Sequence, residues 1–281
     1  MEITSYLDLF RVKHYVKNLI IFMPVFFSGG LFNPQKILLL LPAFFSFCFM
    51  ASSIYIFNDL CDLESDKNHF SKKERPLACG KIQKSNAIIS MFFCILVSVI
   101  LSIYPGNVIA MFILFLYFVL NIFYSKVLKR IPVIDIVVLA SFYWLRLYYG
   151  AVILHITISQ WLYLVVMSGS LYLALGKRRN ELLISAESRD VLKYYSNSYL
   201  NHYMYVCSAL TIVFYALWTI NFKKPEIVWT TPFLVFLLMS YSFVIESNSE
   251  GDPVEVVFNN KILFLIFVLF AACIFAFIYI L

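Results

Sequence analysis

Charged residues are scarce in this sequence. Asp, Glu, Lys and Arg make up 14% of the 281 residues, whereas about a quarter of a soluble domain is charged. Apolar runs of about 17–25 residues recur along the chain, and each is long enough to span a bilayer as a helix. The runs are continuously apolar rather than alternating, which disfavours a transmembrane β-barrel. The composition therefore predicts a polytopic membrane protein without a separate soluble domain.

Cysteine and histidine patterns that bind zinc or form disulfides are also missing. None of the six cysteines belongs to a C-x-x-C pair, and the four histidines are scattered. This pattern argues against a zinc site and against a disulfide framework. Glu2 and Asp8 precede the first basic cluster, and no small-x-small cleavage site follows the first apolar run. We therefore expect no cleavable signal peptide.

The apolar runs predict an all-α fold with nine transmembrane helices around a central cavity, in a single domain over residues 1–281. The expected helices span 18–35, 37–57, 86–104, 107–124, 133–153, 159–176, 200–220, 229–246 and 262–280. Pro24, Gly29 and Gly30 interrupt the first of these runs.

Basic residues gather on one side of the predicted membrane topology. With nine spans, one face receives residues 1–17, 58–85, 125–132, 177–199 and 247–261. The first four segments contain 17 of the 22 Lys and Arg residues, whereas the opposite face holds only Lys36, Lys223 and Lys224. The positive-inside rule then makes the basic face cytoplasmic, in the cell (inner) membrane. The same rule explains the net charge of +6, so nucleic-acid binding need not be invoked.

Four acids stand in nine residues at the end of the second apolar run, in N-D-L-C-D-L-E-S-D, Asn58 to Asp66. Asp59, Asp62 and Asp66 are spaced i, i+3, i+7 and would share one face of a helix. Such acids can simply balance a lysine-rich loop. Together with Asn58 they also form a set of hard oxygen ligands that suits Mg²⁺.

A basic loop follows, H-F-S-K-K-E-R-P-L-A-C-G. Lys72 and Arg75 lie within reach of phosphate oxygens that a metal at the acids would carry. Acids for a metal followed by bases for phosphate, within about twenty residues, are what diphosphate binding needs. The alternative interpretation of the loop is topogenic charge alone.

The motif N-D-x-x-D-x-x-x-D at the end of the second helix, followed by Arg-Pro in a basic loop, resembles the UbiA superfamily of intramembrane prenyltransferases. The resemblance implies a Mg²⁺-bound diphosphate at Asn58, Asp59, Asp62 and Asp66, at the cytoplasmic mouth of a lipid-accessible cavity. It also implies that cytoplasmic loops 58–85 and 177–199 cap the active site.

Most of that superfamily carries a second acidic motif after the sixth helix, and this sequence departs from it. The corresponding stretch reads L-G-K-R-R-N-E-L, with Lys177, Arg178 and Glu181. A helix end with topogenic charge and an internal ion pair is one interpretation. The other is a site for a different phosphate donor, with cations in place of a second metal.

The variant G-K-R-x-x-E resembles the decaprenyl-phosphate phosphoribosyltransferase branch of the superfamily. Three further stretches resemble it as well: R-V-K-H-Y-V-K-N, N-x-x-Y-S-K-x-L-K-R-I-P-x-x-D and G-D-P-V-E-V-V-F-N-N. The resemblance implies transfer of 5-phosphoribose from phosphoribosyl pyrophosphate to a polyprenyl phosphate lipid, without specifying prenyl chain length or oligomeric state. The alternatives are a conventional prenyltransferase and a transporter, and the gathering of charge at one face disfavours transport.

The remaining candidate residues lie at the headgroup level or inside a helix. Lys17 and Lys126 are expected to meet the lipid phosphate. Tyr124 is a further candidate for substrate binding, because it adjoins Ser125 and Lys126 at a helix end. Arg146 interrupts an apolar segment, and a charge within a transmembrane helix indicates function. It can snorkel to the interface or face inward toward substrate or Asp135. Asp135 can instead interact with the dipole at its own helix N-terminus.

Overall fold

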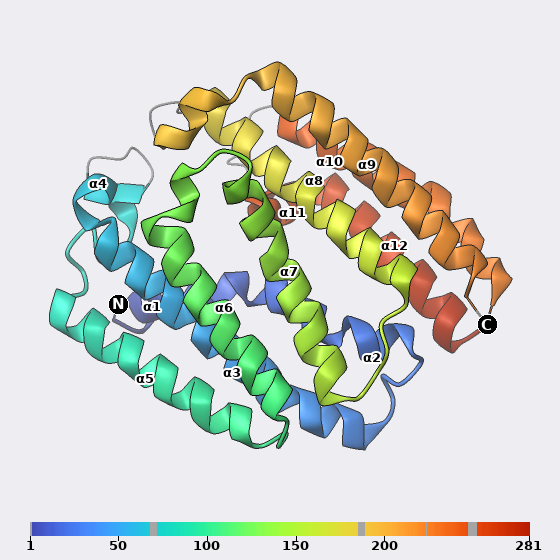
Figure 1. Cartoon of the computed structure of the whole chain (residues 1–281), viewed down its shortest axis with the longest axis horizontal. Coiled ribbons are helices and arrows are strands. Elements are labelled where there is room, and N and C mark those ends of the chain that lie inside the picture. Colours follow the sequence, from blue (N-terminus) through green and yellow to red (C-terminus); the bar gives the residue numbers. More distant parts are fainter. Residues whose placement is uncertain (1, 68–71, 185–188, 223, 247–251) are drawn as a thin grey trace. The chain divides into compact units, whose positions relative to one another are not determined.

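The computed structural model describes residues 2–67, 72–184, 189–222, 224–246 and 252–281 (Figure 1). All regular elements in these ranges are helices, and the ranges contain no strand. The chain forms two compact units. Unit 1 comprises residues 1–125 and 145–156, and unit 2 comprises residues 126–144 and 157–281. The all-α prediction is confirmed for the described part of the chain.

Unit 1 contains the N-terminal elements and three long helices. Its elements are α1 (Glu2–Leu9), the 3₁₀ segment η1 (Val12–Phe22), α2 (Met23–Phe27), α3 (Pro34–Cys61), α4 (Leu63–Lys67), η2 (Lys72–Glu74), α5 (Lys84–Ile103) and α6 (Val108–Lys126). The second half of α7 (Ile134–Ile153) also belongs to this unit.

The start of α3 shows why the helix begins where it does. The Asn33 side chain accepts hydrogen bonds from the backbone N–H groups of Gln35 and Lys36, and Pro34 occupies the first helical turn. Both features favour a helix N-terminus, because they satisfy or remove donors that have no intrahelical partner.

α3 and α5 lie side by side (Figure 1). The hydroxyls of Ser46 and Ser98 each donate to the other residue's carbonyl oxygen, at 2.8 and 2.7 Å. Small residues let two helices approach closely, and reciprocal hydrogen bonds satisfy their polar groups away from water. This contact fixes α5 against the helix that carries the acidic stretch.

Unit 2 contains the C-terminal helices. Its elements are η3 (Leu128–Arg130), the first half of α7, α8 (Gln160–Ile184), η5 (Asp190–Tyr194), α9 (Asn197–Ile220), η6 (Pro225–Thr230), α10 (Thr231–Glu246), α11 (Pro253–Asn259) and α12 (Lys261–Tyr279). α8 and α9 lie side by side, and Thr211 on α9 donates a hydrogen bond to Ser168 on α8.

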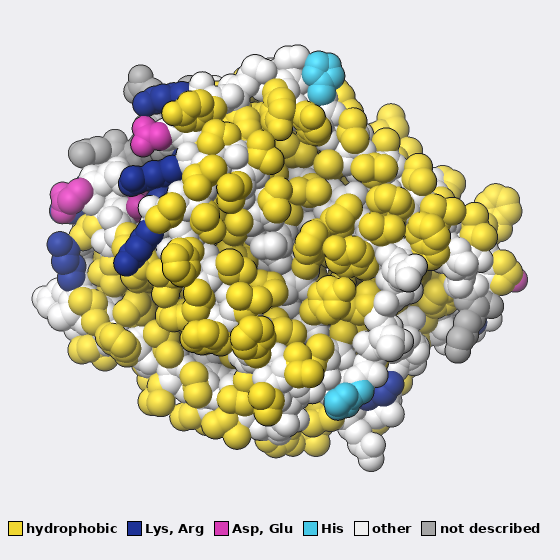
Figure 2. Space-filling model, viewed as in Figure 1, with side chains coloured by type: hydrophobic (Ala, Val, Ile, Leu, Met, Phe, Trp, Pro, Cys, Tyr) yellow, Lys and Arg dark blue, Asp and Glu magenta, His cyan; other side chains and the backbone are white. Residues whose placement is uncertain are grey.

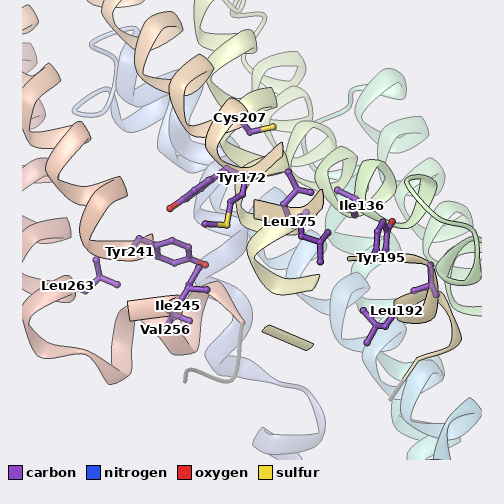
Figure 3. Packing of buried hydrophobic residues seen from close by; sticks show 14 residues of the cluster. Ile136, Tyr172, Leu175, Leu192, Tyr195, Cys207, Tyr241, Ile245, Val256 and Leu263 are labelled. Carbon is purple, nitrogen blue, oxygen red and sulfur yellow. The ribbon is translucent and has the colours of Figure 1, made fainter. Parts of the chain in front are cut away.

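The core of unit 2 forms around α8 and its neighbours. Figure 3 shows Tyr172 on α8 next to Tyr241 on α10, and their ring centroids are 5.6 Å apart. Leu175 follows one turn along α8, and Leu192 and Tyr195 from the segment after α8 belong to the same buried cluster. This packing holds the charged end of α8 against η5.

Seven described helical segments are long and apolar enough to cross a membrane. They are Pro34–Cys61, Lys84–Ile103, Val108–Lys126, Ile134–Ile153, Asn197–Ile220, Pro225–Glu246 and Lys261–Tyr279. They correspond to seven of the nine predicted spans. The predicted sixth span is part of α8, whose last turns carry Lys177, Arg178 and Arg179 and so reduce its apolar length.

The predicted first helix over residues 18–35 is wrong as a single α-helix. The structure has η1, then the five-residue α2, and α2 ends before Gly29 and Gly30. Pro24 removes a backbone donor within this stretch, and Gly29 adopts φ 73° in the turn that follows. A proline and a left-handed glycine both end α-helical hydrogen bonding.

The outward faces of these helices are apolar. Hydrophobic side chains cover most of the face shown in Figure 2. On α5, Ile89, Phe92 and Leu96 are exposed while Cys94 and Ser98 are buried. A helix that hides its small polar residues and exposes its large apolar ones has lipid as its solvent. The chain is therefore a multi-pass membrane protein.

Gly150 on α7 packs directly against the backbone of η1, and we expect Gly150→Ala to destabilise the protein. A Cβ at this position would lie 1.9 Å from the carbonyl oxygen of Ile21 and 2.8 Å from its carbonyl carbon. Forcing η1 away should cost about 1–3 kcal/mol, which is typical of overpacking. Thermal melting in detergent, followed by size-exclusion chromatography, measures the loss.

Gly169→Ala is the matched control for this substitution. A Cβ at Gly169 would meet Thr211 at 3.7 Å, an ordinary van der Waals contact. It should leave the melting temperature unchanged. Equal melting temperatures for the two variants would contradict the proposed close approach of η1 and α7.

Candidate functional site

The acidic stretch begins in the last turn of α3 and ends in α4. α3 ends at Cys61, Asp62 has φ −97° and ψ 10°, and α4 resumes at Leu63. The expectation that three aspartates share one continuous helix is therefore wrong in detail, because the helix breaks at Asp62. The backbone N–H of Asp66 still donates to the Asp62 carbonyl oxygen at 2.8 Å. The turn at Asp62 brings Asp59 and Asp66 to one guanidinium.

That guanidinium belongs to Arg75. Its Nη1 lies 3.0 Å from Asp59 Oδ1 and 2.6 Å from Asp66 Oδ2. Each aspartate is only 3% exposed. A buried carboxylate is stable only with a partner for its charge. The structure thus brings together three residues that the sequence predicts, Asp59, Asp66 and Arg75, and gives the two carboxylates a common cationic partner.

Arg11 completes this cluster, and sequence reasoning missed it. Its Nη2 lies 2.5 Å from Asp59 Oδ1. Its guanidinium carbon stands 4.7 Å from the ring centroid of Tyr55, which is one turn before Asp59 on α3. The available signal was the basic N-terminal segment R-V-K-H-Y-V-K-N, of which sequence reasoning assigns a role only to Lys17.

Asn58 is oriented by α6. The single hydroxyl proton of Ser125 is shared between Asn58 Oδ1 and the Asn121 carbonyl oxygen, both of which lie within hydrogen-bond distance. Ser125 is flanked by two predicted residues, Tyr124, which is buried, and Lys126, which is exposed. The interaction of α3 with the end of α6 therefore involves the Y-S-K stretch that the sequence had singled out.

Arg146 is buried inside unit 1. Its Nε donates to Asn18 Oδ1 at 2.7 Å, and its Nη2 donates to the Tyr117 hydroxyl at 3.0 Å. Its guanidinium also faces the rings of Phe47 and Tyr117 at 5.3 and 5.1 Å. Asn18 in turn donates to Cys48 Sγ at 3.1 Å. Arg146 thus connects α7 to η1, α3 and α6, and Lys17 is half-buried next to Asn18.

In unit 2, Arg178 lies at the centre of a second charged network. It is 0% exposed. Its Nε donates to Asp135 Oδ2 at 2.5 Å, and its Nη1 donates to Glu181 Oε2. Arg189 Nε lies 3.3 Å from the same Glu181 oxygen. Asp135, which was expected to interact with Arg146 or its own helix dipole, is bound by the side chain of Arg178.

Tyr195 fixes the other oxygen of Asp135. Its hydroxyl donates to Asp135 Oδ1 at 2.6 Å and accepts from the backbone N–H of Val133, also at 2.6 Å. Val133 has φ 67°, which is a strained conformation for a β-branched residue. Burial raises the pKa of the Tyr195 phenol, and the hydrogen bond to Asp135 raises it further. The phenol therefore remains a donor at neutral pH.

Glu181 stays ionised in this network. Burial opposes its ionisation, but the guanidinium groups of Arg178 and Arg189 outweigh that effect and lower its pKa to about 2. Asp135 and Glu181 are therefore both neutralised by guanidinium groups of the chain itself.

Lys177 precedes Arg178 and is more accessible. Its side chain is 30% exposed, and its Nζ lies 3.8 Å from Asp252 Oδ2. Asp252 caps α11 by accepting from the backbone N–H of Val254. Sequence reasoning had included Asp252 only in the G-D-P-V-E-V-V-F-N-N stretch, without a role, and had given none to Arg189 or Tyr195.

Two features bear on a metal. Among the residues that the structure describes, no group of three or more His, Cys, Asp or Glu side chains is arranged to hold a metal ion. Asp59 and Asp66 nevertheless each place one carboxylate oxygen next to the same nitrogen, Nη1 of Arg75. Two carboxylates, an amide oxygen and solvent make a donor set that Mg²⁺ accepts when a phosphate supplies further ligands. The side chain of Lys72, another predicted residue, lies outside the described part of the structure.

A family model described as the UbiA prenyltransferase family matches residues 19–180. The chain is 31% identical to the decaprenyl-phosphate phosphoribosyltransferase of Corynebacterium glutamicum, over 96% of this chain and 85% of that protein. It is 30% identical to a protein of the same name from Mycolicibacterium smegmatis, over 84% of this chain and 79% of that protein.

Solved structures agree with this assignment at the level of the fold. A UbiA homologue from Archaeoglobus fulgidus bound to GPP and Mg²⁺ matches with a TM-score of 0.73 at 20% identity, over 98% of this chain and 99% of that one. The sequence matches and the shared fold lead to one conclusion: the chain belongs to the UbiA prenyltransferase family.

Proposed function

We propose that this protein transfers the 5-phosphoribosyl group of phosphoribosyl pyrophosphate to a polyprenyl phosphate and releases diphosphate. The active site faces the cytoplasm from the cell (inner) membrane. A single transmembrane domain surrounds a central cavity, and the loops at 58–85 and 177–199 cap it. Parts of both loops, 68–71 and 185–188, lie outside the described residues.

The pairing of Arg178 with both Asp135 and Glu181 is the observation that carries this proposal. A second acidic motif would bind a second metal on a prenyl diphosphate. Here the two acids are already neutralised by a buried guanidinium, and two partly exposed cations, Lys177 and Arg189, accompany this network. A cationic second site suits phosphoribosyl pyrophosphate, because that donor carries a 5-phosphate in addition to its diphosphate. Two relatives that match most of the chain are named decaprenyl-phosphate phosphoribosyltransferase, which supports phosphoribosyl transfer to a polyprenyl phosphate.

The chemistry needs positioning and charge neutralisation more than proton transfer. The terminal phosphate of the lipid is already anionic at neutral pH and acts as the nucleophile. Its oxygen forms a bond to the anomeric carbon while the bond from that carbon to the diphosphate oxygen breaks. The electron pair leaves with the diphosphate, so stabilising the charge of this leaving group lowers the barrier.

Asn58, Asp59, Asp62 and Asp66 are the proposed residues for Mg²⁺, directly or through water. The convergence of two carboxylate oxygens on Arg75 supports this part of the proposal, because both oxygens already contact one cationic nitrogen. When bound, Mg²⁺ would neutralise the oxygens of the leaving diphosphate.

The cationic residues divide between the phosphates. Lys72 and Arg75 hold the diphosphate, whereas Lys177 holds the 5-phosphate. Arg178 and Glu181 position Lys177 and the ribose through the buried network. Lys17 and Lys126 bind the lipid phosphate, and Tyr124 and Arg146 are further substrate-binding residues.

A donor test distinguishes this reaction from conventional prenyl transfer. Purified protein in detergent receives Mg²⁺, a polyprenyl phosphate and labelled phosphoribosyl pyrophosphate; a parallel sample receives a prenyl diphosphate with aromatic acceptors. We expect label to enter the lipid fraction only in the first sample. Turnover confined to the second sample would sink the phosphoribosyl proposal and favour an ordinary prenyltransferase.

Asp59→Asn should reduce this turnover on the order of 100-fold or more, as loss of a group that stabilises leaving-group charge does. Asp190→Asn is the matched control, because Asp190 is an exposed acid that pairs with Lys193 at 3.2 Å. Equal turnover of the two variants would contradict a role for the acidic stretch. Melting temperatures show whether the Asp59 variant remains folded.

Removing divalent cations should abolish turnover. Dialysis against a chelator takes away the charge that offsets the leaving diphosphate, and added Mg²⁺ should restore the rate. Label transfer before and after restoration is the measurement. Undiminished transfer after dialysis would show that the reaction is independent of a metal.

Lys177 and Arg178 should differ in what their loss affects. Lys177→Gln should raise the KM for phosphoribosyl pyrophosphate about tenfold or more, the value of a charge-assisted hydrogen bond, without changing the melting temperature. Arg178→Gln should lower stability by about 3–5 kcal/mol, because it leaves buried carboxylates uncompensated.

Lys193→Gln serves as the control for both variants, since Lys193 is an exposed cation in η5, the next described element after α8. It should retain wild-type KM and melting temperature. An Arg178→Gln protein with wild-type stability would contradict the claim that the buried network of Arg178, Asp135 and Glu181 stabilises this site.

A further inference from the structure

Arg11 has an unusual backbone conformation. It lies between α1 and η1 with φ 51° and ψ 48°, in the left-handed region. A residue with a Cβ is uncommon there, and asparagine or glycine adopts this conformation with less strain. The strain persists where surrounding interactions offset it. At Arg11 these interactions are the ion pair with Asp59 and the contact with the Tyr55 ring.

Two guanidinium groups share one oxygen at the centre of the cluster. Asp59 Oδ1 lies 2.5 Å from Arg11 Nη2 and 3.0 Å from Arg75 Nη1. The side chains of Arg11 and Arg75 are 21% and 29% exposed, so both reach from solvent to a buried carboxylate. Together with Asp66, the described cluster contains two negative and two positive charges. A divalent cation at these oxygens must displace guanidinium groups from them, since like charges repel.

We propose that Arg11 is a further substrate-binding residue, which exchanges Asp59 for the metal-bound diphosphate when the cation binds. The inference rests on the proposed diphosphate site. A cation alone would leave the displaced guanidiniums without partners, whereas a diphosphate brings anionic oxygens that accept from them. Arg11 and Arg75 then grip the diphosphate together, and binding of cation and diphosphate becomes cooperative.

The backbone beside Arg11 has an anchor that does not depend on Asp59. The Ser52 hydroxyl donates to the Phe10 carbonyl oxygen at 2.8 Å, and the Tyr15 hydroxyl lies 2.8 Å from the same Ser52 oxygen. α1 and η1 therefore remain attached to α3 when the Arg11 side chain leaves Asp59. Only the side chain has to move.

The test measures cation and diphosphate binding rather than turnover. Mn²⁺ is titrated into the full-length protein in detergent, followed by EPR, with and without inorganic pyrophosphate. Arg11→Asn suits the left-handed backbone and removes the charge. Without pyrophosphate it should bind Mn²⁺ about fivefold more tightly, because a competing cation is gone. With Mn²⁺ present it should bind pyrophosphate about tenfold more weakly, because one charge-assisted hydrogen bond is lost.

Lys13→Asn is the matched control. Lys13 is exposed and carries the same charge two residues away, so its loss should change neither affinity by more than about twofold through screened long-range effects. Tighter Mn²⁺ binding together with weaker pyrophosphate binding in Arg11→Asn is expected only if Arg11 moves from Asp59 to the diphosphate. A residue that only anchors α1 would shift both affinities in the same direction or neither.

Each outcome decides the inference. If Arg11→Asn behaves like Lys13→Asn, or weakens binding of Mn²⁺ and pyrophosphate alike, the exchange is wrong. Wild-type protein that takes up no Mn²⁺ even with pyrophosphate would overturn the metal site and the exchange together. Phosphoribosyl pyrophosphate and a prenyl diphosphate both release pyrophosphate. The Mn²⁺ and pyrophosphate titration therefore still tests the role of Arg11 if the donor test rules out phosphoribosyl transfer. If Arg11→Asn does not fold, Arg11→Lys should fold and lose pyrophosphate affinity several-fold, because an ammonium lacks the guanidinium fork; unchanged affinity would contradict the inference.

Discussion

The pairing of buried carboxylates with guanidinium groups is the interaction on which both units depend. Asp59 stands in the last turn of an apolar helix, and Asp135 stands in the first turn of another. Each carboxylate is buried away from water, and an isolated charge is very unfavourable in such an environment. Arginine is suited to the task because it stays charged and offers several donors in a fixed plane. The charged ends of α3 and α7 depend on the arginines that neutralise them.

The two networks differ in how permanent this pairing is. Arg178 is fully buried between two acids and held in place by helix packing, so it can act only as part of the frame. Arg11 and Arg75 are partly exposed and share one oxygen of Asp59. Partly exposed counterions can be exchanged for a ligand, whereas a buried one leaves a charge behind. This difference favours a ligand-binding cluster in unit 1 and a fixed, cationic support in unit 2.

Helix packing in unit 1 places the N-terminal segment, residues 10–22, next to the acidic stretch. Gly150 lets the Ile21 carbonyl approach α7, and Arg146 binds Asn18 on the same segment. Ser52 on α3 holds the chain at Phe10. These contacts use small residues, a buried cation and hydroxyls, the groups that join helices where no hydrophobic effect drives them together. A segment that cannot form a regular helix is thereby fixed beside the acidic stretch.

The sequence by itself determined the all-α membrane class, seven of the nine expected spans, the acidic stretch and the missing second acidic motif, because each depends on composition or on residues close in the chain. It gave the wrong structure for 18–35, where η1 depends on contacts with distant helices. Only the tertiary structure decided that Arg11 meets Asp59, 48 residues away, and that Arg178 meets Asp135, 43 residues away. Helical periodicity predicts which side chains share one face of a helix. Packing decides which residue of another helix each of them contacts. For a buried charged side chain, that contact determines whether the side chain is available to bind a ligand.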